Sequence, residues 1–311
     1  MDALVSLLNG PRAQGAFLLR SIMDAPWSMR IQDEAPLTVV AIVTGSAWIR
    51  PDGRGAEHLQ PGDVAVALGP TPYLVADDPD TPAQVIIHPG QRCTTIYGAD
   101  LAQEMSLGVR TWGNSPHGET TMLTGTYQMA GAVSRRMLSA LPTLAVLRAQ
   151  DWDCPLIPLL ADEIVKDEPG QEAVLDRLLD LLLIAVLRSW FARPEGEAPG
   201  WYRANSDPVT GRALRLIHNN PAQAWTVASL AAQSGVSRAA LARRFTEMVG
   251  EPPMSYLTGW RLALAADLLH EPDSTVDSVA RKVGYSNGFA LSAAFKRVRG
   301  VSPREHRRLA G

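Results

Sequence analysis

The sequence predicts an α+β multidomain protein, in which a β-rich domain and a helical segment precede a separate all-α domain. Three observations support this fold class. Short strand-type runs bounded by Gly, Pro and Asp occupy the early part of the 311 residues, and helical patterns occupy the rest. From residue 207 onward, 14 Lys and Arg stand against 8 Asp and Glu, whereas the remainder has a net charge of −9. Part of this basic region also recurs about 50 positions later.

The composition describes a globular protein, with 46% hydrophobic and 20% charged residues. A basic unit joined to an acidic one is typical of a polyanion-binding module attached to a separate sensor. Neither Cys93 nor Cys154 belongs to a CxxC pair, so no structural zinc site is expected. The start lacks the basic region of a signal peptide, and the apolar run Leu178–Leu187 is too short for a bilayer span. We therefore expect a cytoplasmic protein without a membrane partner.

The β-rich region follows a short amphipathic helix at Asp2–Leu8. Its strand-type runs are closely spaced and separated by turn residues, which predicts an antiparallel sandwich or barrel. Leu59–Val64 contains Pro-Gly-Asp and is a tight turn that begins a strand. The expected strands are Phe17–Leu19, Thr38–Val43, Ala47–Ile49, Val64–Ala67 and Gln84–Ile87.

The segment 134–193 is expected to be helical. One helix opens at Asp153–Pro155 and ends at the break of Pro169 and Gly170. The longest helix, Gln171–Phe191, is apolar over more than one stripe, so it needs two neighbours to bury its surface. One neighbour is the β-rich domain. The other is either the same helix of a second subunit, which would make a homodimer, or another part of this chain.

A linker rich in Pro, Gly and charge is expected over 194–206, between domains 1–193 and 207–311. Asp207 is the expected N-cap of the next helix, with Pro208 at its first position. The helix over 253–270 joins two halves of the last domain and spans about 25 Å at about 1.5 Å per residue. The expected helices are 208–218, 226–233, 237–249, 253–270, 275–283, 287–299 and 303–309.

The stretch 225–245 has the pattern of two short helices joined by a tight turn. Thr226 is placed as an N-cap, and Gly235 stands where the first helix must end in a left-handed residue. Ser237 can cap the second helix, whose apolar stripe faces inward and whose arginines face outward. This pattern predicts a helix-turn-helix motif, in which the second helix enters the major groove of DNA.

The same pattern recurs in the chain. Val279–Ser286 resembles Leu230–Ser237, and Gly284 follows Gly235 by 49 positions. Because only two copies occur, a tandem pair of helix-turn-helix motifs is preferred to a solenoid. The same residue types also recur 50 positions later: Phe295, Gly300 and Pro303 follow Phe245, Gly250 and Pro253 at this spacing.

On these motifs, residues 207–311 resemble the DNA-binding domain of the AraC/XylS family of bacterial transcription regulators. The rest of the chain resembles the cupin-type N-terminal regions that accompany one subgroup of this family. The family implies activation through contact with RNA polymerase, and it supports the homodimer. The matching stretches are Ser234–Ser237, Phe245, Gly250–Pro253, Tyr256–Leu257, Trp260–Leu262, Ala265–Ala266, Leu268–Leu269, Val279–Ala280, Val283–Ser286, Phe295–Lys296 and Gly300–Pro303.

The resemblance places the base-contacting positions of the first recognition helix on Ala239, Ala242 and Arg243. Only Arg243 can make a bidentate contact, for which guanine is the usual partner. Arg238 and Arg244 are expected to bind phosphates.

The second recognition helix departs from the family pattern. Ala293 stands where the family often has arginine, so sequence reading by this helix is expected to be weaker. Lys296 and Arg297 still provide phosphate contacts. The corresponding face of this helix comprises Asn287, Gly288, Ser292 and Ala293.

The barrel shows no metal-binding pattern. Metal-dependent cupins present paired histidines and a carboxylate on one face, because iron or manganese needs several N and O ligands. Here His58, His88 and His117 are unpaired in sequence. We therefore expect no cofactor, and an apolar interior that holds a small-molecule effector. The candidate lining residues are Trp27, Trp48, Tyr73 and Ile86.

Cys93 is a second candidate for sensing. Arg92 precedes it and would lower its pKa, and a thiolate is the form that oxidants attack. A small buried hydrophobic role is the alternative for Cys93.

The sequence thus predicts a sequence-specific regulator of transcription that is not an enzyme and whose cupin-like domain senses a small molecule or a redox signal. The resemblance further implies a homodimer that activates transcription. Its partners would be double-stranded DNA, RNA polymerase and an unidentified effector. A metal-dependent cupin oxygenase fused to a DNA-targeting domain is the alternative function.

Overall fold

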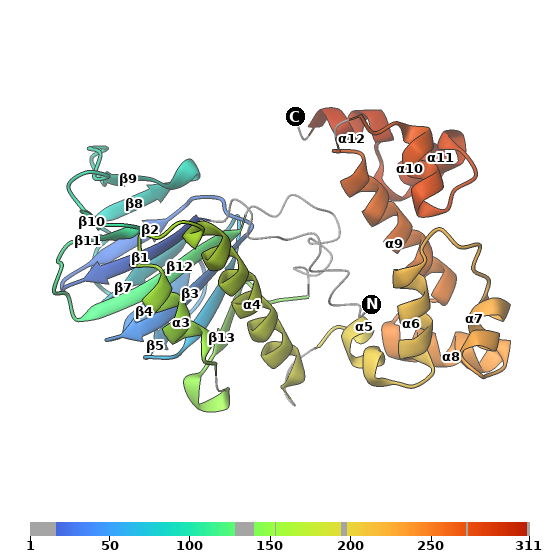
Figure 1. Cartoon of the computed structure of the whole chain (residues 1–311), viewed down its shortest axis with the longest axis horizontal. Helices are drawn as coiled ribbons and strands as arrows, with labels where there is room; N and C mark the ends of the chain where they lie inside the picture. Colours follow the sequence, from blue (N-terminus) through green and yellow to red (C-terminus); the bar gives the residue numbers. More distant parts are fainter. Residues whose placement is uncertain (1–16, 128–139, 153, 194–197, 272, 310–311) are drawn as a thin grey trace. The chain divides into compact units, whose positions relative to one another are not determined.

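The computed structural model describes residues 17–127, 140–152, 154–193, 198–271 and 273–309. They form two compact units (Figure 1): residues 17–127 and 141–193 build the N-terminal unit, and residues 198–309 build the C-terminal unit. The helix expected at Asp2–Leu8 and the start of the expected helical segment lie outside the described residues.

The N-terminal unit contains two β-sheets, and the five expected strands all coincide with strands of the structure. Eight further strands in the described residues were not expected, and they are spread over the whole unit. In chain order the strands are β1 (Phe17–Met23), β2 (Ser28–Ile31), β3 (Leu37–Thr44), β4 (Ala47–Pro51), β5 (Glu57–Leu59), β6 (Val64–Leu68), β7 (Tyr73–Ala76), β8 (Val85–His88), β9 (Arg92–Thr95), β10 (Ser106–Gly108), β11 (Thr111–Gly113), β12 (Thr120–Tyr127) and β13 (Leu144–Leu147).

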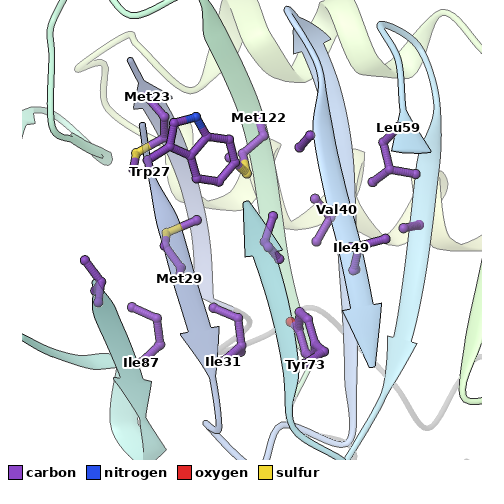
Figure 2. Packing of buried hydrophobic residues seen from close by; sticks show 14 of the residues in the cluster. Met23, Trp27, Met29, Ile31, Val40, Ile49, Leu59, Tyr73, Ile87 and Met122 are labelled. Atoms are coloured by element: carbon purple, nitrogen blue, oxygen red, sulfur yellow. The ribbon is translucent and has the colours of Figure 1, made fainter. Parts of the chain in front are cut away.

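The larger sheet has the strand order β10-β11-β1-β12-β3-β6-β13, and the smaller sheet has the order β5-β4-β7-β2-β8-β9. Most neighbours are antiparallel, but β1 pairs with β11 and β2 with β8 in parallel. One face of each sheet contributes to a shared apolar cluster (Figure 2), which includes Met23, Trp27, Met29, Tyr73 and Met122. Successive residues of a strand point to opposite faces, so only alternate residues reach this cluster.

The segment expected to be entirely helical contains a strand. β13 pairs antiparallel with β6, from Leu144 opposite Ala67 to Leu147 opposite Val64. Ala145 and Leu147 are buried, while Leu144 and Val146 pack against the apolar cluster, so both faces of the strand are apolar. A short run without polar alternation cannot be assigned to strand or helix by periodicity, which explains the wrong expectation.

The two helices that follow are α3 (Leu156–Glu163) and α4 (Gln171–Ala192), separated at Pro169 and Gly170 as expected. α4 packs on the outer face of the larger sheet. The hydroxyl of Tyr127 donates to the carbonyl oxygen of Leu179 over 2.7 Å. A Cβ added at Gly125 would lie 2.6 Å from a methyl carbon of Leu179, so the glycine allows this close approach.

The C-terminal unit is helical throughout its described residues. Its helices are α5 (Gly200–Arg203), α6 (Thr210–Asn219), α7 (Val227–Gln233), α8 (Arg238–Val249), α9 (Pro253–Leu268), α10 (Val276–Val283), α11 (Gly288–Arg299) and α12 (Pro303–Leu309).

The linker expected over 194–206 is too long at its C-terminal end. α5 and the 3-10 turn Ala204–Ser206 pack within the C-terminal unit, where Trp201 and Ala204 are buried. A Cβ added at Gly200 would lie 2.5 Å from the carbonyl oxygen of Met248 in α8. Residues 200–206, which were expected to be linker, therefore belong to the folded unit, because the buried side chain of Trp201 packs in it.

Gly125→Ala tests how closely α4 fits on the larger sheet. The added methyl group should displace Leu179 and lower the free energy of unfolding by about 1–3 kcal/mol, the usual cost of overpacking. Gly55→Ala is the matched control, because a Cβ there meets nothing within 4 Å. Thermal unfolding followed by circular dichroism measures both. Equal melting temperatures for the two variants would contradict the packing described.

Candidate functional site

The C-terminal unit contains two equivalent pairs of helices, α7 with α8 and α10 with α11. Each pair begins with the same reciprocal cap. The Thr226 hydroxyl accepts from the Ser229 amide over 3.0 Å, and the Ser229 hydroxyl accepts from the Thr226 amide over 2.9 Å. Thr275 and Ser278 repeat both hydrogen bonds at 3.1 and 3.0 Å. The sequence repeat is thus a structural repeat with the same local chemistry.

The turns between the paired helices require glycine. Gly235 has a φ of +72° and Gly284 a φ of +89°, both in the left-handed region, as the sequence predicted for Gly235. Gly284 also lies close to the loop between α6 and α7. A Cβ added there would lie 2.7 Å from Cα of Ala222 and 2.8 Å from the guanidinium of Arg261.

Arg261, which has no role assigned from sequence, connects the two halves of the unit. From α9 it donates through Nε to the carbonyl oxygen of Pro221 and through Nη2 to that of Gln223, each over 2.7 Å. Its guanidinium also lies 6.0 Å from the ring centre of Tyr285, in the turn before α11. Burial lowers the pKa of Arg261 from its ordinary value. Arg261 therefore holds the α6–α7 loop against the α10–α11 turn.

The outward face of α8 carries most of the side chains expected there. Arg238, Ala239 and Arg243 are exposed, and Ala242 is half-buried. The guanidinium of Arg243 lies 3.8 Å from a carboxylate oxygen of Glu247, an exposed i,i+4 pair that contributes little energy and leaves the arginine available. The opposite face packs inward through Leu241 and Phe245, as predicted.

Arg244, which is expected to bind phosphate, has a partner within the unit that the sequence did not reveal. It forms an ion pair with Asp207, whose side chain is buried and also accepts from the Thr210 amide over 2.7 Å. Burial alone would raise the pKa of Asp207, but the hydrogen bonds from Thr210 and Arg244 outweigh it and hold the pKa below its ordinary value. The Asp207 carboxylate thus accepts from the amides of Val209 and Thr210 at the start of α6, which is the kind of contact its predicted capping role requires, and Arg244 is its ionic partner.

Asn287, Gly288 and Ser292, which are expected to face DNA on α11, each have a hydrogen-bond partner within the unit. The Asn287 side chain caps the helix by accepting from the Ala290 amide over 2.9 Å. Gly288 is buried, and its amide donates to a carboxylate oxygen of Asp277 over 2.7 Å. The Ser292 hydroxyl donates to the carbonyl oxygen of Gly288 over 2.7 Å. The sequence alone does not reveal these partners.

The outward face of α11 carries a residue that sequence reasoning missed. Phe289 is 85% exposed at the first turn of the helix. Ala293, Lys296 and Arg297 are also exposed. The 50-residue repeat of the sequence could have identified Phe289, because it makes Phe289 the equivalent of Ala239, which is expected to contact the bases.

The four candidate effector residues do not form one group. Trp27 and Tyr73 belong to the apolar cluster between the sheets. Trp48 and Ile86 lie next to inward-facing residues of their strands and therefore point to the opposite face of the smaller sheet. Trp48 stacks instead on His58, with ring centres 4.7 Å apart.

Cys93 lacks the activation expected from Arg92. Burial, and secondarily the negative charge of Asp100, raise the pKa of the thiol above its ordinary value. Cys93 packs against the apolar cluster, whereas Arg92 is exposed, because neighbours on a strand face opposite ways. The geometry fits the alternative of a small buried hydrophobic residue.

The histidines of the barrel have separate surroundings. His88 hydrogen-bonds to the hydroxyl of Thr94 over 2.9 Å, and His117 is exposed. Within the part of the chain that the structure describes, no three His, Cys, Asp or Glu side chains converge in a way that could hold a metal ion. In the same residues, no helix has the length and apolar character needed to cross a membrane.

Fold and site together define a two-domain protein that combines a cupin barrel with a helix-turn-helix domain. A Cupin family model matches residues 2–192, and a Helix-turn-helix domain model matches residues 230–309. The chain belongs to the AraC-like transcription regulators, and it is a DNA-binding regulator of transcription.

Similar proteins support this assignment over the full length. A putative AraC-like transcription regulator of Streptomyces antibioticus is 40% identical over 316 residues, covering 99% of both chains. One from Streptomyces lividans is 28% identical and covers 99% of this chain and 98% of the relative. The HTH-type transcriptional regulator AlkR of Acinetobacter baylyi is 27% identical and covers 99% of both.

The pair of Asp207 and Arg244 gives a prediction about stability and pH. Asp207→Ala should lower the free energy of unfolding at pH 7 by about 1 kcal/mol, because α6 loses its cap. Since the folded-state pKa is depressed, this stabilisation is complete above the unfolded carboxyl pKa of about 3.9 and is lost as the pH falls through the folded value.

Thermal unfolding of the wild type and Asp207→Ala at neutral and acidic pH measures this difference. Arg244→Ala and the double variant complete a double-mutant cycle. The double variant should lose less than the sum of the single losses. Additive losses, or a penalty for Asp207→Ala that grows below pH 4, would contradict the pairing.

Proposed function

We propose that the C-terminal unit reads two successive major-groove segments of double-stranded DNA, one with α8 and one with α11. The observation that carries this proposal is the structural repeat itself: two identically capped helix pairs, held together by Arg261 on the connecting helix α9. α9 has 16 residues and spans about 24 Å. With the packing at both ends, it can hold two recognition helices near one DNA turn apart, about 34 Å.

The exposed side chains suggest a role for each position of α8. Arg243 can donate two hydrogen bonds to O6 and N7 of guanine. Ala239 and Ala242 can make only apolar contacts with the bases. Arg238, at the start of the helix, is placed to bind phosphate, which positions the helix without specifying sequence. On α11, Lys296 and Arg297 have the same phosphate-binding role.

The N-terminal unit supports a homodimer through α4. Val174 and Leu181 are seven residues apart, so they lie on one face of the helix, and they are 44% and 50% exposed. Leu159 of α3 is a further exposed apolar residue of this helical segment. A two-fold dimer that pairs these faces would bury them and would place two copies of the C-terminal unit on one operator.

The barrel is the proposed sensor. Its inner cluster is built of aliphatic, aromatic and Met side chains, including Trp27 and Tyr73, which favours an uncharged apolar effector over a charged one. We propose a regulator without enzymatic activity in preference to the oxygenase alternative, because the full-length relatives are named as transcription regulators. By family, it acts in the cytoplasm as an activator that contacts RNA polymerase.

Selection of bound sequences from a random DNA pool with the full-length protein tests the main proposal. The expected result is a motif with two boxes about one helical turn apart, present in two copies if the protein binds as a dimer. Recovery of no enriched sequence, together with uniformly salt-sensitive binding, would overturn it.

Arg243→Ala separates base reading from phosphate binding. The variant should lose about 1–3 kcal/mol of binding free energy on the selected sequence and accept other bases at one position. Lys296→Ala should weaken binding to specific and random DNA alike and reduce the salt dependence of the affinity. Fluorescence anisotropy over a salt series measures both. Equal losses of Arg243→Ala on specific and random DNA would contradict the role of Arg243.

The double variant Val174→Glu and Leu181→Glu tests the dimer. Charges on the apolar face of α4 should convert the dimer to a monomer, because buried unpaired carboxylates are costly. Analytical ultracentrifugation gives the mass. Val298→Glu is the control, since Val298 is also an exposed apolar residue, 56% exposed, but belongs to α11 and lies outside this face. A wild-type protein that is monomeric at micromolar concentration would refute the proposal.

A further inference from the structure

Phe289 is unlike the other large aromatic residues of the C-terminal unit. It is 85% exposed, whereas Trp201, Trp225, Phe245, Tyr256, Trp260 and Phe295 are buried. The ring therefore contributes little to the core of the unit, and its contribution has to be sought on the surface.

The backbone around Phe289 is held firmly. The Asn287 side chain caps the helix at Ala290, and a carboxylate oxygen of Asp277 accepts from the Gly288 amide. A Cβ added at Gly288 would lie 2.8 Å from that carboxylate, so a side chain there would break the contact. The first turn of α11 is thus fixed on α10, and Phe289 is the first residue of the helix whose side chain is free to project outward.

The residues that share a helix face with Phe289 define the chemistry of its partner. Ala293, Lys296 and Arg297 follow at spacings of four, seven and eight, so all four lie along one stripe. The N-terminal half of this stripe is apolar, and no side chain in it can donate or accept a hydrogen bond. The C-terminal half is basic. A partner must offer an apolar group flanked by negative charge.

DNA meets this requirement at one kind of position. The C5 methyl group of thymine is the apolar group that the major groove presents, and Phe and Ala are side chains that contact it. Phosphates on either side of the groove match the charges of Lys296 and Arg297. Phe289 also occupies the position equivalent to Ala239, which faces the bases in the first recognition helix.

We propose that Phe289, together with Ala293, reads thymine methyl groups in the box bound by α11. This inference rests on the proposed DNA-reading role of the C-terminal unit and deepens it: the second half specifies thymine by apolar contact instead of acting only as a phosphate clamp. The same contact would accept 5-methylcytosine, which carries its methyl group at the equivalent place in the groove.

The test removes single methyl groups from the DNA. An operator is first selected from the random pool with the full-length protein, and each thymine of the α11 box is then replaced in turn by deoxyuridine. One or two replacements should weaken wild-type binding about fourfold each, which corresponds to about 0.8 kcal/mol for one buried methylene-sized group. Phe289→Ala should bind the thymine operator more weakly and should respond less than the wild type to those replacements, because only Ala293 still contacts the methyl groups.

Two further variants make the result specific to Phe289. Phe289→Leu keeps an apolar side chain and should retain part of the sensitivity to deoxyuridine. Val298→Ala is the matched control, because Val298 is 56% exposed on the same helix but lies nine residues on, on the opposite side. It should leave both the affinity and the sensitivity unchanged.

The outcomes separate this inference from the proposed function. If the wild type selects two boxes but tolerates every deoxyuridine, the reading of thymine by Phe289 is wrong, and DNA reading by the unit stands. If Phe289→Ala impairs transcription without changing DNA binding, the ring contacts a protein partner and the inference also fails. If no sequence is selected at all, the proposed function itself has failed.

Discussion

The hydrogen bonds from Arg261 to the carbonyl oxygens of Pro221 and Gln223 set the geometry of the C-terminal unit. They bring the loop between α6 and α7 so close to the α10–α11 turn that only glycine fits at position 284. A guanidinium that is partly withdrawn from water is stabilised only when its donors are satisfied, so the two loops and the arginine require one another. The two helix pairs are therefore joined by this contact as well as by α9.

The two helix pairs of the C-terminal unit have the same backbone arrangement but carry different exposed side chains. Both begin with the same Thr and Ser cap and both turn at a left-handed glycine. α8 presents arginine outward, whereas α11 presents an aromatic ring followed by cations. The caps and turns that hold each helix pair are the same, whereas the exposed residues of α8 and α11 differ. One half is therefore suited to hydrogen-bonded contacts and the other to apolar ones.

Local features of this chain could be predicted from sequence, and features that depend on distant partners could not. The caps at Thr226 and Ser237 and the turn at Gly235 are decided within three or four residues, and all three are confirmed. The ion pair of Arg244 was not predicted, because its partner Asp207 is 37 positions away. Which face of the sheet Trp48 and Ile86 point to depends on strand register. The strand β13 was not predicted, because both of its faces are covered and its sequence therefore lacks the alternation of polar and apolar residues.

The segment that precedes α6 in the C-terminal unit packs against α8. Gly200 lies against the last carbonyl oxygens of α8, and Asp207 is bound to Arg244 on the same helix. The incoming segment is thus fastened to α8 at two points before the core of the unit begins. A displacement of the segment from Gly200 to Asp207 would therefore displace α8 as well, because the two are joined at both contacts.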